Sequence, residues 1–282
     1  MIEWMKPGNN VVITGGASGI GLAAASRFLA ADMRVLISDI DEAALAAAQQ
    51  ELVDSFGEKG PTLLTHVCDV SSFEGVQQLQ LVAAEKLGAT HCLMNNAGAG
   101  VRTASPWEDL AQWTKQVDIN LWGIVHGCHA FIPGMLASEE RCAVINTGSK
   151  QGITNPPGNY AYNMSKAGVK AYTESVAHAL RQEDHCRVTA HLLIPGFTYT
   201  GMIARFVPEK PAGAWTPKQT VDYMLASLER DEFYILCPDN DTPRELDEKR
   251  IQWNVDDLLK NRSALSRWDP KYQSEFEAFM AN

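Results

Sequence analysis

The chain has 282 residues, of which 45% are hydrophobic and 21% charged, and its formal net charge at pH 7 is −10. Such a chain can bury a sizeable core, and we expect one domain over residues 1–282, with a catalytic core over about 9–237 and a helical tail over about 238–282. The acidic balance argues against a nucleic-acid-binding protein, and without a long apolar run or a signal-peptide layout we expect a cytoplasmic protein that does not enter membranes.

Short apolar runs alternate with helical patterns along most of the chain. The runs predict seven strands, at residues 11–13, 35–37, 63–67, 91–94, 143–145, 188–194 and 233–236. Helices are expected over about 20–31, 43–56 (capped by Asp41), 71–87 (capped by Ser71), 107–136 (bent near Pro133) and 159–183. This alternation favours parallel strands with both sheet faces covered, and hence a doubly wound, Rossmann-type α/β fold. After a turn-rich break, two further helices are expected near 244–261 and 270–280, as a tail packed on the domain.

The first predicted strand runs into a glycine-rich turn, residues 14–21 (TGGASGIG). Gly15, Gly19 and Gly21, with Ser18 and Ile20 between them, let the backbone approach a pyrophosphate, and the following helix points its N-terminus at the negative charge. The spacing is G-x-x-x-G-x-G rather than G-x-G-x-x-G. Its position between a strand and a helix favours a dinucleotide site over an ordinary turn.

Asp39 ends the second predicted strand, where a carboxylate can accept both ribose hydroxyls of an adenosine and would repel a 2′-phosphate. No Arg or Lys lies in the glycine turn or beside Asp39, so NAD is favoured over NADP. The alternative is that Asp39 only caps the next helix, but Asp41 is better placed for that. Asp69 and Val70 follow the third strand, where a carboxylate can meet the adenine amino group.

Residues 95–98 (NNAG) follow the fourth strand. The small Ala97 and Gly98 leave room for a cofactor, and Asn95 and Asn96 can tie neighbouring strands together. Each of these features alone is compatible with ordinary loop chemistry.

Tyr162 and Lys166 stand four residues apart in a predicted helix and therefore on one face. A free phenol has a pKa of about 10, and a nearby cation favours the phenolate. Lysine together with the positive nicotinamide ring of a cofactor is expected to lower this pKa to roughly 7, so that the phenol can act as an acid/base at neutral pH. Tyr160 has no such partner, because Met164 stands four residues after it. By itself the spacing is common and usually marks a surface pair.

Two further polar residues join this pair. Ser149 follows the fifth strand, at the edge where parallel sheets bind ligands, and its hydroxyl can donate to a substrate oxygen. Asn120 lies inside a helical stretch, where asparagine is a poor helix former, which favours a buried polar role.

The cysteines and histidines indicate no metal site. Six scattered cysteines without a C-x-x-C pair are expected to be free thiols, and His126 and His129 lack a third ligand nearby.

Together these motifs resemble the short-chain dehydrogenase/reductase family over residues from about 9 to 237. The resemblance rests on residues 14–21, Asp69, residues 95–98, Asn120, Ser149, Tyr162, Lys166 and Pro195-Gly196. It implies that Tyr162 is the catalytic acid/base, that Ser149 holds the reacting oxygen, and that Lys166 binds the nicotinamide ribose and lowers the tyrosine pKa. It also implies that Asn120 holds a proton-relaying water, and that Thr198 and Thr200 contact the nicotinamide carboxamide or a nearby phosphate.

We therefore expect an NAD-dependent alcohol dehydrogenase or ketone reductase that forms a homodimer or homotetramer. The segment after Gly196 is expected to form a substrate lid, and the lid and tail carry apolar residues that suit an apolar, aromatic or cyclic secondary alcohol: Phe197, Tyr199, Met202, Ile203, Phe206, Val207, Trp215, Trp253, Leu258, Leu259 and Trp268. Equally, these residues could pack the tail or form an interface. Two features depart from the family pattern. They are Lys150 and Gln151, which either line the substrate pocket or face solvent, and the long tail. The alternatives are an NAD-retaining lyase or epimerase and a non-catalytic NAD sensor.

Overall fold

The fold is a single parallel sheet between two layers of helices. The computed structural model describes residues 2–57, 62–100 and 105–281. Within them, seven parallel strands are arranged in the order β3-β2-β1-β4-β5-β6-β7. The strands are β1 (Asn10–Thr14), β2 (Arg34–Asp39), β3 (Leu63–Val67), β4 (Cys92–Asn95), β5 (Cys142–Thr147), β6 (Val188–Ile194) and β7 (Tyr234–Leu236). The predicted doubly wound fold is confirmed, and its strand order reverses between β1 and β4.

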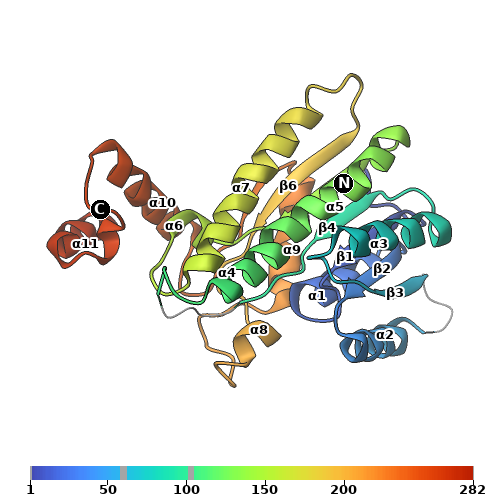
Figure 1. Cartoon of the computed structure of the whole chain (residues 1–282), viewed down its shortest axis with the longest axis horizontal. Helices are drawn as coiled ribbons and strands as arrows, with labels where there is room; N and C mark the ends of the chain where they lie inside the picture. The colour runs from blue at the N-terminus through green and yellow to red at the C-terminus, as the bar shows by residue number, and fades with distance from the viewer. Residues whose placement is uncertain (1, 58–61, 101–104, 282) are drawn as a thin grey trace.

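Helices cover both faces of this sheet (Figure 1). One apolar cluster joins the sheet to α1 (Gly19–Leu29), α2 (Glu42–Phe56) and α9 (Pro217–Glu229). A second cluster on the opposite face includes α3 (Phe73–Lys86), α5 (Gly123–Ala137) and α7 (Tyr160–Leu180). Strand side chains alternate between the two, as Val11 and Ile13 belong to the first and Val12 to the second.

The long helix predicted over 107–136 is divided. It consists of α4 (Leu110–Val117), the π-helical turn η1 (Asp118–Trp122) and α5. The break in the regular helix lies at η1, whereas Pro133 is inside α5, so a bend at Pro133 stays a prediction. A π turn inserts an extra residue and is frequent at functional sites, and here it carries the fully buried Asn120.

Two helix starts differ from the sequence-based expectation. Ser72, not Ser71, caps α3 by accepting a hydrogen bond from the Gly75 amide at 3.2 Å, because Ser71 instead donates to Asp69. The crossover helix α9 was missed altogether. Its signal was a capping box in which Thr216 and Gln219 bond each other's backbone amides, with a proline at the first helical position.

The C-terminal tail forms α10 (Arg244–Leu259) and α11 (Gln273–Ala281), joined by short 3-10 turns, so the predicted helical extension is confirmed. The tail contacts the body where α10 meets the short helix α6 (Gln151–Thr154), and α11 lies away from the sheet (Figure 1). That the tail and the core fold as one domain stays a prediction. Among the described helices, none has the length and apolar character needed to cross a bilayer.

Candidate active site

The glycine-rich turn lies at the point where the strand order reverses, between β1 and α1. Gly15 has φ +64°, and a side chain there would place its Cβ 2.7 Å from the Cα atom of Ala97. A Cβ on Gly21 would overlap the carbonyl oxygen of Gly15. These glycines therefore let the turn pack tightly against the loop after β4. Ser18 is exposed at the start of α1, where its side chain makes no capping bond.

Asp39 ends β2 beside this turn. One of its carboxylate oxygens accepts from the Ala17 amide at 3.4 Å, and the other accepts from the Asp41 amide at 3.3 Å. Asp41 itself caps α2 by accepting from the Ala44 amide at 3.0 Å, as the sequence predicted. The helix cap is thus supplied without Asp39, whose partly exposed carboxylate is available to a ligand at the glycine turn.

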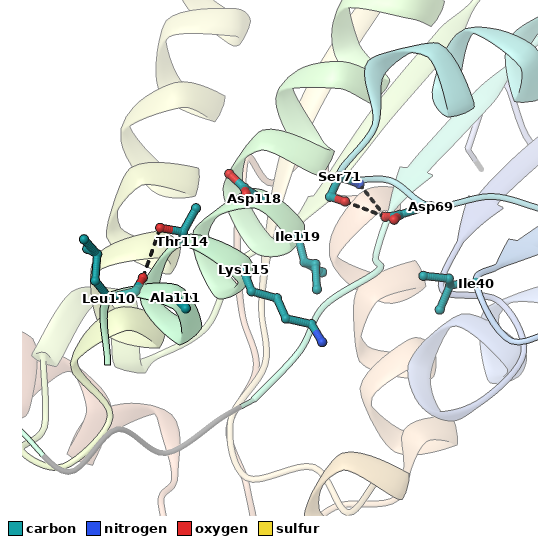
Figure 2. Close-up of a pocket in the computed structure, with 9 residues that line it drawn as sticks. All are labelled: Ile40, Asp69, Ser71, Leu110, Ala111, Thr114, Lys115, Asp118 and Ile119. Atoms are coloured by element: carbon teal, nitrogen blue, oxygen red, sulfur yellow. Dashed lines mark hydrogen bonds between the residues drawn. The ribbon is translucent and has the colours of Figure 1, made fainter. Parts of the chain in front are cut away.

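A cavity of about 610 Å³ opens beside the ends of β2 and β3 (Figure 2). Ile40, which is 64% exposed, and Ile119 give it apolar walls, while Asp69 contributes a carboxylate. The Asp69 side chain is fixed by the amide and hydroxyl of Ser71, at 2.9 and 2.7 Å. Lys115 and Asp118 also line the cavity. Apolar walls beside the fixed carboxylate of Asp69 suit a flat aromatic ring that bears an amino group, such as adenine. Val70, the next residue, is buried.

The residues after β4 tie the neighbouring strands together, as expected. Asn95 donates to the side chain of Asn146 on β5 at 2.9 Å. The Asn96 side-chain amide donates to the carbonyl oxygens of Thr14 and Gly15 at 3.2 and 3.1 Å, and its backbone amide donates to the Thr14 hydroxyl. This network fixes the loop that carries Ala97 and Gly98 against the glycine turn.

Tyr162 and Lys166 lie one turn apart on α7, and both face the end of β5. The Lys166 Nζ atom is 5.8 Å from the centroid of the Tyr162 ring and donates to the Thr147 carbonyl oxygen at 2.7 Å. The Ser149 hydroxyl hydrogen-bonds the Tyr162 phenol. The structure therefore brings together the side chains of Ser149, Tyr162 and Lys166, which the sequence analysis proposed to act together on the substrate.

Burial dominates the electrostatics of these groups in the protein without cofactor. Burial raises the pKa of Tyr162, and the Ser149 hydrogen bond offsets only part of that rise. Burial also lowers the pKa of Lys166 to about 8. In the protein without cofactor the lysine therefore does not outweigh the effect of burial on the phenol, and the positive charge of a bound oxidised nicotinamide would add to that of Lys166 in favouring the phenolate.

Asn120 holds the backbone after β4 in place. Its side chain accepts from the Ala99 amide at 2.7 Å and donates to the Ala99 carbonyl oxygen at 2.9 Å. It also donates to the Ser165 hydroxyl at 3.3 Å. Gly98 lies between Asn120 and Lys166, since a Cβ there would be 3.3 Å from the Asn120 Oδ1 and 3.8 Å from the Lys166 Nζ. The relay water assigned to Asn120 by resemblance stays a prediction.

The loop after β6 carries Pro195 and Gly196. Thr200 packs against the glycine turn, because a Cβ on Gly19 would lie 3.2 Å from its methyl carbon. Thr198 is buried, and its hydroxyl pairs with that of Thr220 on α9 at 2.9 Å. Thr200 is thus the threonine that lies beside the phosphate-binding turn, whereas the Thr198 side chain faces α9.

Of the two locations expected for Lys150, exposure to solvent is not observed: its side chain is 16% exposed and forms ion pairs with Asp239 and Asp247. The sequence carried no signal for this, because both carboxylates lie about 90 residues away and come close only through the fold. The neighbouring Gln151 amide donates to the Ser149 hydroxyl at 3.2 Å.

The lid segment is residues 197–215, which follow Gly196 and include the short helix α8 (Gly201–Ala204). Phe197, Phe206 and Val207 are 38–58% exposed. Met202 lies over Gly100, where a Cβ would be 2.9 Å from its sulfur. Trp253, in contrast, belongs to the tail's own core: it is 2% exposed, with the Arg262 guanidinium 3.7 Å from its ring centre and the Phe276 and Phe279 rings at 5.2 and 5.3 Å.

Comparison with known proteins gives one consistent result. The family described as short chain dehydrogenase matches residues 9–211. A 2,3-dihydroxy-2,3-dihydro-p-cumate dehydrogenase of Pseudomonas putida is 31% identical over 206 residues, which cover 72% of this chain and 76% of the relative. A 1-deoxy-11-beta-hydroxypentalenate dehydrogenase of Streptomyces avermitilis is 31% identical over 232 residues, covering 80% and 83%. A short-chain dehydrogenase/reductase from Burkholderia phymatum, solved in complex with NAD, has a TM-score of 0.82 and 29% identity, covering 93% of this chain and 98% of its own.

Proposed function

This chain belongs to the short-chain dehydrogenase family of oxidoreductases, and we propose that it transfers hydride between NAD and an apolar, cyclic or aromatic secondary alcohol or the corresponding ketone. The observation that carries the proposal is the meeting of Ser149, Tyr162 and Lys166 at the end of β5, next to the glycine turn.

The cofactor is NAD. The glycine turn from Gly15 to Gly21 and the N-terminus of α1 fit a pyrophosphate. Asp39 fits an unphosphorylated ribose, and the cavity at Asp69 fits the adenine. The similar structure from Burkholderia phymatum holds NAD, which supports this assignment. When bound, NAD supplies the carbon that accepts or returns the hydride.

We assign the proton steps to the chain's own side chains. In the oxidative direction the Tyr162 phenolate takes the proton of the substrate hydroxyl, and in the reductive direction the phenol returns it to the ketone oxygen. Ser149 donates a hydrogen bond to that oxygen and stabilises the charge that develops on it. Lys166, anchored on Thr147, supplies a positive charge and a donor for the nicotinamide ribose. Asn120 hydrogen-bonds the Ala99 backbone and thereby fixes the neighbouring Gly98 in place.

The substrate class follows from the lid segment. Its exposed Phe197, Phe206 and Val207, with Met202 over Gly100, give the open side of the site an apolar surface. The names of the two relatives describe dehydrogenases that act on a dihydroxy-dihydro-cumate and on a hydroxypentalenate, which supports a bulky alcohol.

Assembly and location complete the proposal. The exposed rings of Phe73 on α3 and Trp122 in η1 lie 5.5 and 6.1 Å from the partly buried ring of His126 on α5, and together they form an aromatic patch. Such a patch supports a homodimer or homotetramer, which we place in the cytoplasm. Light scattering of the purified protein tests the oligomer.

The experiment that tests the function is turnover of a panel of apolar secondary alcohols with NAD or NADP, followed through the absorbance of the reduced cofactor. Net formation of reduced cofactor, faster with NAD than with NADP, is the expected result. Product formation without net NADH would indicate the lyase or epimerase alternative. Cofactor binding without any turnover across the panel would indicate the sensor.

A further inference from the structure

A buried ion cluster lies directly behind the proposed active site. The Lys150 Nζ atom is 2.6 Å from an oxygen of Asp247 and 3.2 Å from an oxygen of Asp239. All three side chains are largely buried, at 16%, 6% and 7% exposed. Buried charges persist only when they are paired, so this cluster holds its members firmly in place.

Each member of the cluster belongs to a different part of the fold. Lys150 follows the proposed catalytic Ser149 after β5, and its amide donates to the Pro195 carbonyl oxygen after β6 at 3.3 Å. Asp239 lies after β7, and Asp247 lies on α10 in the tail. One lysine therefore joins the ends of three neighbouring strands to the C-terminal extension.

Asp239 extends the linkage to the loop proposed to hold the nicotinamide. The carboxylate oxygen that pairs with Lys150 also accepts from the Phe197 amide at 3.1 Å. The pair packs so closely on Gly196 that a Cβ there would lie 2.6 Å from Asp239 and 2.8 Å from the Lys150 Nζ. Moving the lysine or its carboxylates would therefore disturb the backbone of this loop.

We propose that Lys150 is a positioning residue, which holds Ser149 and the Pro195–Phe197 loop in place through Asp239 and makes that placement depend on the tail through Asp247. This inference rests on the function proposed above. On this view the tail governs catalysis without contacting the substrate, because its helix α10 carries one of the two carboxylates that fix the lysine. Burial raises the pKa of Asp247, and its hydrogen bond and ion pair with Lys150, together with Arg250 on the same helix, offset part of this rise by favouring the charged form.

The test compares Asp247→Asn and Lys150→Met with the wild-type protein. The first keeps the shape of the side chain and removes the charge that anchors the lysine from the tail. We expect each variant to lower kcat/KM for the alcohol by at least about 10-fold, mainly through kcat, because small displacements of catalytic groups have large effects. The double variant should lose no more than Lys150→Met alone, since both changes cut the same linkage.

A second readout does not depend on turnover. Hydrogen exchange at the Phe197 amide should speed up in both variants, because its acceptor Asp239 is no longer held by an anchored lysine. If the wild-type protein turns over no alcohol, the proposed function fails, but exchange at Phe197 still tests the linkage. Should Lys150→Met not fold, Asp247→Asn decides alone.

Glu248→Gln is the matched control. Glu248 is the next residue on α10, but it pairs with Arg244 in an exposed ion pair at 2.8 Å. This variant should leave both kcat/KM and Phe197 exchange unchanged. The proposal is overturned if Asp247→Asn keeps wild-type kcat/KM and wild-type protection at Phe197, even when its melting temperature falls, because the cluster would then be only structural.

Discussion

The Lys166 Nζ atom lies 5.8 Å from the centre of the Tyr162 ring, and its hydrogen bond to the Thr147 carbonyl oxygen, 2.7 Å long, ties it to the end of β5. The lysine is 3% exposed, and burial lowers its pKa to about 8. It therefore carries its charge below about pH 8 and loses it above. The phenol next to it has its pKa raised by burial, so the pair depends on the cofactor to become an effective base.

The pH dependence of turnover follows from this pair. Alcohol oxidation needs the phenolate, so its rate should rise with pH, whereas ketone reduction needs the phenol and should fall. Lys166→Met removes the positive charge that the protein itself places beside the phenol. The midpoint of the rise of the alcohol-oxidation rate with pH should therefore move to higher pH, with kcat at neutral pH lowered about 100-fold. Lys170→Met is the control, because Lys170 pairs with Glu174 on the same helix. An unchanged midpoint in Lys166→Met would contradict this role.

Cofactor choice depends on the carboxylate at the end of β2. Asp39→Ala removes a charged acceptor for the ribose hydroxyls, and we expect the KM for NAD to rise about 10- to 100-fold, as lost hydrogen bonds to a charged group predict. The ratio of NADP to NAD turnover should rise as well.

Asp41→Ala serves as the matched control for Asp39→Ala. It removes the α2 cap, which accepts from the Ala44 amide, and should lower the free energy of unfolding by about 1 kcal/mol without changing cofactor preference. A wild-type preference for NADP, or an unchanged preference in Asp39→Ala, argues against the assignment of Asp39.

The lid segment makes a separate prediction about substrate binding. Met202→Gln keeps the side-chain length but adds a polar group over Gly100. The KM for an apolar cyclic alcohol should rise about 10-fold, with the Kd for NAD unchanged, because a mismatched pocket group typically has an effect of this size. Leu258→Gln, at a position 84% exposed on the tail, should change neither constant. An unaltered KM in Met202→Gln would show that the substrate does not contact Met202.

The core of the tail can be tested by protease sensitivity. Trp253→Ala removes the side chain on which Arg262, Phe276 and Phe279 pack, a change that typically costs about 3–5 kcal/mol. Limited proteolysis should then cut within residues 254–281 and leave residues 9–237 intact. Trp268→Ala, at a site 36% exposed, should have a smaller effect. Cleavage spread equally over both regions would mean that the tail has no separate core.

Most strands were predictable because buried parallel strands read as apolar runs, as in β6, whose predicted range 188–194 coincides with the strand. The predicted range 63–67 also coincides with β3, although this edge strand is only partly buried. Helix α9 was missed although its sequence carries a start signal, the capping-box pair Thr216 and Gln219 with a proline between them, because that signal was not read. Within the site, Tyr162 and Lys166 were predictable from their spacing on one helix only in combination with Ser149 and the other motifs of the family. Asp239 and Asp247 were not, because they meet Lys150 only where the strand ends and the tail converge.

The central claim is that the Tyr162 phenol moves the proton of the reacting alcohol. The most direct measurement is the rate of NADH formation by Tyr162→Phe, compared with Tyr160→Phe, which alters a tyrosine two residues earlier on α7. We predict that Tyr162→Phe lowers kcat by at least about 100-fold while it still binds NAD, and that Tyr160→Phe retains wild-type turnover. A Tyr162→Phe enzyme that forms NADH at close to the wild-type rate would contradict the account.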